Sequence, residues 1–337
     1  MSYNTESIRN IALAGHAGAG KTTLFEALLH AGGAIQSIGS VERGNTVSDT
    51  DAQEQSRGHS IDSSIALVEH GDCRINLIDT AGYADFRGGT LSALAAVESV
   101  AIVVNAINGI EHGTRRMMMH AQQRGLARML VINKIDFDGA DLGALVDALR
   151  EEFGSQCLPV NLPAQRGNRV LDCFFHDDGT TDFSSLAAAH QQIIDQVVEI
   201  NEALMGRYLD EGEEALSAQQ LHDAFEQCLR EGHLVPICFT SARTGVGVKE
   251  LLDVAARLLP NPAEGNPPPF VRGDGTPLQV RADPTAHVIA DVFKIVNDPF
   301  VGKLGVFRVW QGTVRRDSQL LVDDGRKPFK VGHLFRL

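Results

Sequence analysis

The chain has 337 residues, 43% of them hydrophobic, and 43 acidic against 30 basic side chains give it a formal net charge of −13. A chain of this length can bury a large core and hold more than one domain. The acidic balance argues against wrapping nucleic acid by bulk charge, so we expect no direct sequence-specific binding of nucleic acid.

The N-terminal stretch MSYNTESIRN is polar and lacks the apolar centre of a secretion signal. The sequence also lacks the run of about eighteen apolar residues that a membrane-spanning helix needs. Its five cysteines are scattered and form no CxxC pair, a pattern typical of reduced thiols in the cytosol. We therefore expect a cytoplasmic protein without membrane contact, and we expect a monomer.

From residue 8 onward, short apolar runs alternate with helical periodicity. Residues 8–15 predict a buried strand, and 22–33 predict a helix with one apolar face. We expect the polar, aperiodic residues 34–60 to form a long mobile loop, followed by two strands within 64–80. Further strands are expected at 100–107, 127–136 and 234–242, and helices at 113–124 and 141–153. This alternation predicts crossover connections on a mostly parallel sheet, which is a doubly wound α/β domain.

A helical insertion is expected at residues 161–232, between the fifth and the last strand. One long amphipathic helix should carry Leu186, Ile193 and Leu204, and a second should begin at the capping box Ser217–Gln220. Five prolines fall between positions 260 and 269, so we expect the first domain to comprise residues 1–262.

Residues 263–282, rich in proline and glycine, predict a linker. Residues 283–337 are patterned as β-strands, with a turn expected at Asp323-Asp324-Gly325, and we expect them to begin an all-β barrel domain. Some fifty residues are too few to close a barrel of about six or more strands, so we expect the chain to be truncated.

The segment GHAGAGKT at residues 15–22 matches the phosphate-loop pattern GxxxxGK[ST] and lies between a predicted strand and a predicted helix. Backbone N–H groups in that position can surround a phosphate chain, which a plain glycine turn would not require. Lys21 would neutralise the β and γ oxygens, and the Thr22 hydroxyl would bind Mg²⁺. The residues expected to hold the nucleotide here are Gly15, His16, Ala17, Gly18, Ala19, Gly20, Lys21, Thr22 and Thr23.

A second motif, Asp79-Thr80-Ala81-Gly82, ends an apolar strand. The Asp79 carboxylate can hold the metal through a water, and the Gly82 N–H can meet the γ-phosphate. Alone this pattern is weak, but behind a phosphate loop it favours a nucleotide-hydrolysing site in which Lys21 and Gly82 act on the γ-phosphate.

The base is expected to be guanine. In VINKID, Asn133, Lys134 and Asp136 follow a strand, and the Asp136 carboxylate can accept hydrogen bonds from N1–H and the 2-amino group of guanine. Adenine offers neither donor, so such a site can reject ATP by about 10⁴-fold or more. The backbone of Ser241 and Ala242 can reach the guanine oxygen. Together the motifs predict a P-loop GTPase domain with GTP/GDP and Mg²⁺ as cofactors.

The order and wording of these motifs resemble a translational GTPase of the elongation factor G family. RGHSI (57–61) is similar to its RGITI, DTAGYADF (79–86) to its DTPGHVDF, and VINKIDFDGADL (131–142) to its NKMDRTGADF. FKIVNDPFVGKLGVFRVWQGTV (293–314) resembles the start of its second domain. The likeness covers nearly the whole chain and implies a ribosome-activated GTPase, hence the ribosome as partner.

Several positions depart from the family pattern. Ala81 in DTAGYADF stands where the family's DTPGHVDF has proline, and Ala17 and His59 replace two apolar residues that gate the catalytic histidine. Ser60 replaces a threonine whose hydroxyl binds Mg²⁺, a bond that serine can also make. Gly18 replaces an aspartate implicated in binding an additional cation, so dependence on that cation is open. Tyr83 replaces the catalytic histidine.

A neutral phenol is a poor general base at neutral pH, but this chemistry relies mainly on positioning water and stabilising charge. We expect Tyr83 to be a slower catalytic residue that positions the water, with very slow unstimulated turnover. His59 is an alternative for this role, and Arg57 is a weak candidate for an arginine finger. The more ordinary interpretation of both is a solvated loop residue.

Three functions remain open. The first is a ribosome-stimulated GTPase, and the second is a GTP-gated ribosome-binding module in which cleavage is vestigial and GTP orders residues 36–62. The third, a P-loop ATPase or kinase, is disfavoured by Asp136. Within the first, translocation, ribosome recycling, release-factor removal and ribosome protection are not distinguished, although the departures at 18, 81 and 83 suggest a divergent paralogue.

Overall fold

The computed structural model describes residues 3–174, 176, 178–298, 300–322, 325 and 327–335. The chain divides into two compact units, Met1–Asn266 and Pro267–Leu337.

The first unit is built on a seven-stranded sheet with the order β2-β3-β1-β4-β5-β9-β6. All pairings are parallel except that of β2 with β3, so the predicted doubly wound, mostly parallel α/β fold is confirmed. The short strand β6 was not predicted, because three residues carry no readable periodicity. The strands are β1 (Ile8–Gly15), β2 (Ser64–His70), β3 (Cys73–Asp79), β4 (Ser99–Asn105), β5 (Ala127–Asn133), β6 (Cys157–Pro159) and β9 (Val235–Thr240).

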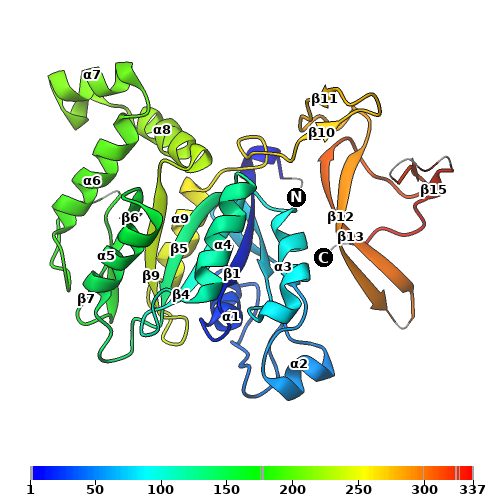
Figure 1. Ribbon diagram of the computed structural model, residues 1–337, viewed down its shortest axis with the longest axis horizontal. Coiled ribbons are helices and arrows are strands. Elements are labelled where there is room, and N and C mark those ends of the chain that lie inside the picture. The colour runs from blue at the N-terminus through cyan, green and yellow to red at the C-terminus, as the bar shows by residue number, and fades with distance from the viewer. Residues whose placement is uncertain are drawn as a thin grey trace. The chain divides into compact units, whose positions relative to one another are not determined.

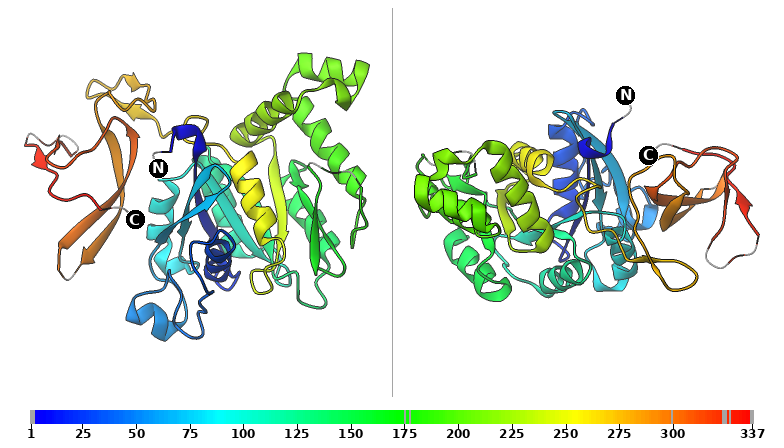
Figure 2. Two further views of the ribbon diagram at one scale, coloured as in Figure 1. Left: turned by 180° about the vertical axis from the view of Figure 1, so that it is seen from behind. Right: turned by 90° about the horizontal axis from the view of Figure 1, so that it is seen from above.

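Helices cover both faces of this sheet (Figures 1 and 2). Helices α1 and α9 lie on one face, and α3, α4 and α5 lie on the other. Strands β4 and β5 are buried at every residue, which explains their nearly continuous apolar sequences. Leu24, Phe25, Leu28 and Leu29 of α1 are buried as their spacing predicts. The bounds are α1 Lys21–Ala31, α3 Arg87–Leu94, α4 His112–Gln123, α5 Leu142–Phe153 and α9 Val248–Leu258.

The long loop expected at 34–60 contains a helix, α2 (Ala52–Arg57). Asp51 caps its N-terminus in a capping box with Glu54, and Gly58 ends it in the left-handed conformation. A six-residue helix is too short to show amphipathic periodicity, so only its capping residues could have revealed it. The description of this whole segment as a loop was therefore wrong.

The insertion starts with a hairpin of β7 (Asn161–Ala164) and β8 (Arg169–Asp172) and continues as three helices. The single long helix expected here is two, because the Asn201 side chain caps the N-terminus of a new helix, to which Leu204 belongs. The capping box Ser217–Gln220 is present. The helices are α6 (Leu186–Val198), α7 (Glu202–Glu211) and α8 (Ala218–Glu231).

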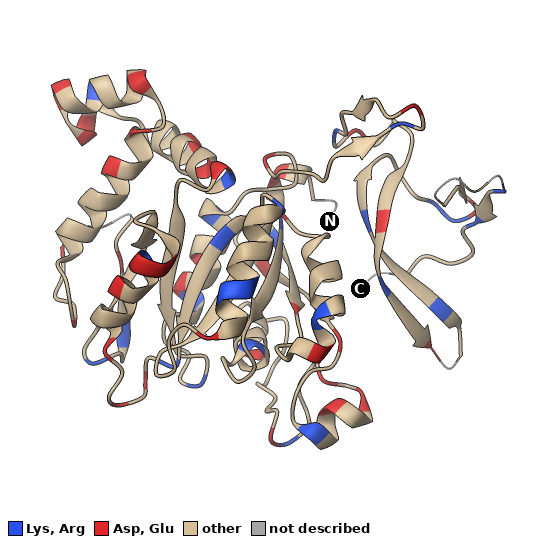
Figure 3. Ribbon diagram, in the orientation of Figure 1, with Lys and Arg blue, Asp and Glu red and all other residues tan. Residues whose placement is uncertain are grey.

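The helices of the insertion carry far more acidic than basic side chains, as Figure 3 shows. Arg207 and Arg230 are the only Lys or Arg residues of the sequence between positions 186 and 231. The acidic residues of the same stretch are Asp195, Glu199, Glu202, Asp210, Glu211, Glu213, Glu214, Asp223, Glu226 and Glu231. This charge makes the insertion repel phosphate backbones.

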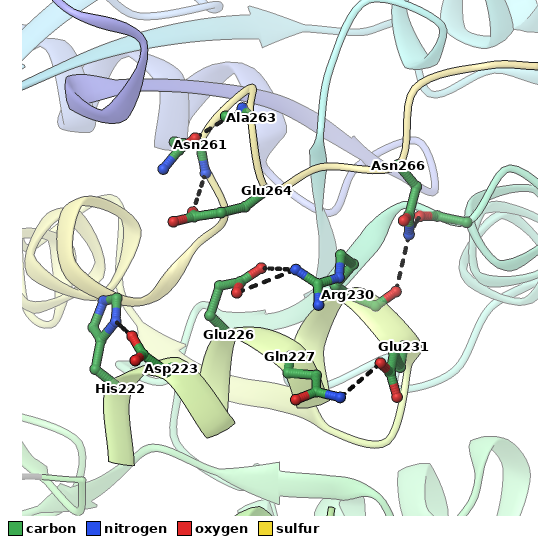
Figure 4. Close-up of polar contacts among 11 residues, drawn as sticks. His222, Asp223, Glu226, Gln227, Arg230, Glu231, Asn261, Ala263, Glu264 and Asn266 are labelled. Atoms are coloured by element: carbon green, nitrogen blue, oxygen red, sulfur yellow. Dashed lines mark hydrogen bonds and ion pairs between the residues drawn. The ribbon is translucent and has the colours of Figure 1, made fainter. Parts of the chain in front are cut away.

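The last residues of the first unit are attached to its body by polar contacts around α8 (Figure 4). The side-chain amide of Asn266 donates to the carbonyl oxygens of Gly125 (2.7 Å) and Arg230 (3.0 Å). On the same helix Arg230 pairs with Glu226, with Nη1 to Oε1 at 2.9 Å. Nearby, Glu264 accepts the N–H of Asn261 at 2.9 Å. The compact unit therefore extends to Asn266.

The second unit consists of three antiparallel strand pairs, which do not join into one sheet among the described residues. Trp310 is buried and donates from Nε1 to Asp291 at 3.0 Å. Asp323 and Asp324 of the expected turn lie outside the described residues, between the paired strands β14 and β15. The strands are β10 (Phe270–Val271), β11 (Pro277–Leu278), β12 (Ile289–Asp298), β13 (Gly302–Gln311), β14 (Gln319–Leu320) and β15 (Phe329–Lys330).

Three single-turn 3₁₀ helices complete the described elements: η1 (Thr5–Ser7), η2 (Ala84–Phe86) and η3 (Glu213–Ala215). Within the described ranges, every helix is too short or too polar to pass through a lipid bilayer.

Candidate nucleotide-binding site

The predicted motifs meet at one edge of the parallel sheet. Strands β1, β3, β5 and β9 all end at this edge, and their following loops carry the four motifs. In open α/β sheets, ligands bind outside the carboxyl ends of the strands. The geometry therefore offers one site made from segments that lie far apart in the sequence.

The phosphate loop runs from Gly15 into α1. Gly20 caps the helix with φ of 92°, and a Cβ there would lie 2.5 Å from Nδ2 of Asn133, so only glycine fits. Thr23 lies in the first turn of α1. Across the loop, Nε2 of His16 lies 3.5 Å from Oε1 of Glu111.

Lys21 is buried and turns back onto its own loop. Its Nζ donates to the carbonyl oxygens of Gly15 (3.2 Å) and His16 (2.9 Å). Burial lowers the pKa of Lys21 to about 8, although the charges of Asp79 and Glu111 act in the opposite direction. An anionic ligand beside this ammonium would raise its pKa again.

The three predicted metal residues come together. Oγ1 of Thr22 donates to Oδ2 of Asp79 at 2.7 Å and lies 3.1 Å from Oγ of Ser60. Ser60 in turn donates to Oδ1 of Asp49 at 2.8 Å. Asp49 is a site residue that the sequence did not reveal, because it lies in a segment without a motif or a period.

The oxygen atoms of this cluster fit Mg²⁺. Oδ1 of Asp79 and Oδ2 of Asp49 are buried without a hydrogen-bond partner. Burial raises the pKa of Asp79 to about 7, against the hydrogen bond from Thr22 and the charge of Lys21, and it also raises the pKa of Asp49. Unpaired buried carboxylate oxygens are costly, and carboxylate and hydroxyl oxygens are the ligands that Mg²⁺ prefers.

Gly82 packs directly on the phosphate loop. A Cβ at this position would lie 2.4 Å from Nζ of Lys21 and 2.8 Å from Cα of Ala17, so no larger residue fits without displacing the loop. The start of the segment is anchored by Thr80, whose hydroxyl donates to the carbonyl of Leu13 at 2.7 Å. The backbone at Gly82 thus lies beside the ammonium that would bind phosphate.

Tyr83 projects partly into solvent, with 48% of its surface exposed. Its ring centroid lies 4.5 Å from that of His59, which also lies 5.9 Å from Phe86. The two side chains considered for positioning water are therefore neighbours, and Tyr83 directly follows Gly82, which packs on the phosphate loop.

Asn133 joins the two ends of the site. Its Nδ2 donates to the carbonyl of Ala19 at 3.1 Å, and its Oδ1 accepts the N–H of Ala242 at 3.0 Å. Lys134, with φ of 70°, extends its side chain to the phosphate loop, where Nζ donates to the carbonyl of Gly18 at 2.8 Å. Both residues therefore connect the phosphate loop to the region predicted to bind the base.

The carboxylate of Asp136 is only 7% exposed and has a donor on each oxygen. Oγ of Ser241 donates to Oδ1 at 2.6 Å, and Nη2 of Arg243 donates to Oδ2 at 2.7 Å. The contact with Ser241 brings together two predicted motifs. Arg243 was not predicted, because nothing in the sequence pairs it with a residue 107 positions away.

Comparisons with known proteins agree on the relationship of this chain. A family profile described as the elongation factor Tu GTP binding domain matches residues 6–261. An elongation factor G-like protein of Mycobacterium tuberculosis, in strains CDC 1551 / Oshkosh and H37Rv, is 33% identical over 329 residues, covering 94% of this chain and 46% of that protein. A crystal structure from Thermus thermophilus matches with a TM-score of 0.83 and 30% identity, covering 98% of this chain and 49% of the other. The chain spans about half the length of these relatives.

Proposed function

The chain belongs to the elongation factor Tu GTP-binding domain family of translational GTPases, and on that premise we propose that it binds GTP and hydrolyses it to GDP and phosphate when docked on the ribosome. The proposal places it among elongation factor G-like proteins, as a divergent member acting in the cytoplasm. The ribosome is the proposed partner, and GTP/GDP and Mg²⁺ are the proposed cofactors.

The observation that carries this proposal is the bridge made by Asn133. Its side chain bonds to the phosphate loop at Ala19 and to the loop after β9 at Ala242, so phosphate and base regions are set at a fixed separation. The loop after β9 is also joined to Asp136, which accepts a hydrogen bond from Ser241. A plain phosphate-binding turn would need no such connection.

The residues of the chain are assigned the following roles. Lys21 would leave its two carbonyl partners and bind the β- and γ-phosphate oxygens, and the Gly82 N–H would meet the γ-phosphate. Thr22, Ser60, Asp79 and Asp49 would hold Mg²⁺, which when bound neutralises phosphate charge. Tyr83 would orient the attacking water and needs no full proton abstraction to do so.

The binding-module alternative shares every residue of the site except the role of Tyr83. This side chain is half-exposed and its ring packs on His59. We propose that Tyr83 leaves this position to orient the attacking water. Docking on the ribosome would supply that movement. External factors can stimulate GTP hydrolysis about 10⁵-fold, so a slow free enzyme is compatible with a fast one on the ribosome. We therefore favour the enzyme.

The test compares nucleotide binding with turnover. Purified protein in magnesium buffer should bind GTP and GDP, and excess ATP should not displace them, because adenine lacks the donors that Asp136 accepts. GTP turnover should then rise at least about tenfold on adding ribosomes, and Tyr83→Phe should remove most of that rise. Unchanged turnover on ribosomes with intact GTP binding would favour the binding module, and displacement by ATP would overturn the proposal.

A further inference from the structure

Arg243 contacts the carboxylate of Asp136, which is proposed to bind the guanine base. Its Nη2 donates to Oδ2 of Asp136 at 2.7 Å, and its own side chain is 68% exposed. The other oxygen of Asp136 accepts from Ser241. A nearly buried carboxylate thus already has one donor on each oxygen, both from the loop that follows β9.

Two further contacts hold the arginine in this place. Its guanidinium carbon lies 5.0 Å from the ring centroid of Phe137, a cation–π arrangement. The preceding residue, Ala242, donates its N–H to Asn133, so the backbone of the loop is fixed relative to Asp136. An exposed arginine with a charge-assisted hydrogen bond and an aromatic contact is positioned more firmly than its exposure alone suggests.

The consequence concerns the substituent at C2 of the purine. Guanine presents N1–H and a 2-amino group, and each carboxylate oxygen has a second lone pair that can accept such a donor while the arginine stays bound. Xanthine presents a carbonyl oxygen in place of the amino group, which a bare carboxylate repels. The guanidinium of Arg243 offsets the charge on Asp136, and because the ion pair with Asp136 holds it in place, its further N–H groups can donate to such an oxygen.

We propose that Arg243 is a specificity-determining residue of the base subsite, which lowers the discrimination between guanine nucleotides and nucleotides of purines with an oxygen at C2. This inference rests on the proposed function, because it requires a purine base at Asp136. It assigns the residue a role in the choice of base and none in the hydrolytic step.

The experiment measures affinities of the full chain for GDP, XDP and IDP in magnesium buffer. All three ligands carry the same diphosphate, so a change in phosphate binding or in the amount of folded protein cancels in their ratios. Arg243→Leu should raise the preference for GDP over XDP about tenfold, the effect of losing one charge-assisted hydrogen bond. IDP, which has no substituent at C2, should change less.

Three controls sharpen the result. Arg124→Leu, at an exposed arginine of the turn after α4, should leave both ratios at the wild-type value. Arg243→Lys, which keeps the charge but not the planar set of donors, should fall between wild type and Arg243→Leu. In an Asp136→Asn background, the effect of Arg243→Leu should shrink below about threefold, because the ion pair no longer exists.

The outcomes separate this inference from the proposed function. If wild-type protein binds GDP and Arg243→Leu leaves the ratio of GDP to XDP within about twofold, the inference is overturned and the proposed function stands. The inference also fails if the effect persists undiminished in the Asp136→Asn background. If wild-type protein binds none of the three nucleotides, both are overturned.

Discussion

Two buried carboxylates, Asp79 and Asp49, face the hydroxyl groups of Thr22 and Ser60, and each retains one oxygen without a hydrogen bond. Without a cation, the site relieves this cost by keeping a proton on Asp79, whose pKa is raised by burial to about 7. Binding of a divalent ion must displace that proton. Metal affinity should therefore increase with pH up to about 7.

Because Asp79 holds this proton in the folded state, we expect the effect of Asp79→Asn on the thermal stability of the protein to depend on pH. The folded pKa of Asp79 lies above the unfolded value of 3.8, so the stability that its proton contributes is full below that value and is lost as pH rises through about 7. Asn carries no such proton. The difference in Tm, Asp79→Asn minus wild type, should therefore grow from pH 5 to pH 7 and then level off, in buffer with a chelator.

Thermal denaturation across that range measures this difference. The pKa of Lys21 is higher, at about 8, so the change in Tm between pH 5 and pH 7 reflects mainly the titration of Asp79. The exposed Asp210 provides a matched substitution, Asp210→Asn, which should show no trend with pH. A constant difference for Asp79→Asn would contradict the raised pKa.

At this scale, the sequence revealed residues that belong to contiguous motifs and missed those that reach the site through folding. Lys21, Asp79 and Asp136 lie in patterns whose spacing is set by a strand ending in a loop. Asp49 and Arg243 contact Ser60 and Asp136 only in three dimensions. No period or motif encodes such contacts.

The short helix α2 holds residues 58–62, the loop that contains Ser60, through the buried carboxylate of Glu54. Oε1 of Glu54 accepts the N–H groups of Ile61 (2.8 Å) and Asp62 (3.1 Å), and Oε2 accepts that of Asp51 at 3.3 Å. Glu54 is 5% exposed. The element therefore positions Ser60, which lies next to Ile61 in the chain, by hydrogen bonds to its neighbours.

Replacing this carboxylate should release the loop without unfolding the domain. Glu54→Ala leaves three backbone N–H groups unsatisfied, those of Asp51, Ile61 and Asp62, at a local cost of about 1–3 kcal/mol for each. Hydrogen exchange at residues 58–62 should accelerate, and magnesium-dependent GTP affinity should fall. Gln53→Ala, at an exposed neighbour on the same helix, should change neither. Unchanged exchange in Glu54→Ala would show that other contacts hold the loop.

Elements with a long, regular pattern were predictable, and elements defined by caps or by few residues were not. Helix α1 and strands β4 and β5 follow from apolar periodicity alone. Helix α2 depends on its capping box, and the break between α6 and α7 depends on the side chain of Asn201. Such local hydrogen bonds interrupt a pattern that apolar spacing would continue.

On the scale of the whole molecule, the first compact unit contains every residue of the candidate site, and it ends where Asn266 bonds to Gly125 and Arg230. Limited digestion with trypsin should cut after the exposed Arg272 or Arg281 and leave a fragment that binds GDP as the full chain does. Arg128, in the buried strand β5, should resist cleavage.

Titrating GDP into the digested, repurified fragment measures this. Loss of GDP affinity after cleavage would contradict the assignment of the whole site to the first unit. Retained affinity would show that the second unit is not needed to hold the nucleotide.

For the proposed GTPase, the bridge made by Asn133 also bears on how the product nucleotide would leave. Its side chain ties the phosphate loop to the loop after β9, so separating these two segments would break both hydrogen bonds. The opposite wall, with Asp49 and Ser60, is attached through α2 and a few hydrogen bonds. We infer that GDP escapes past this wall, and that any factor hastening exchange would act there.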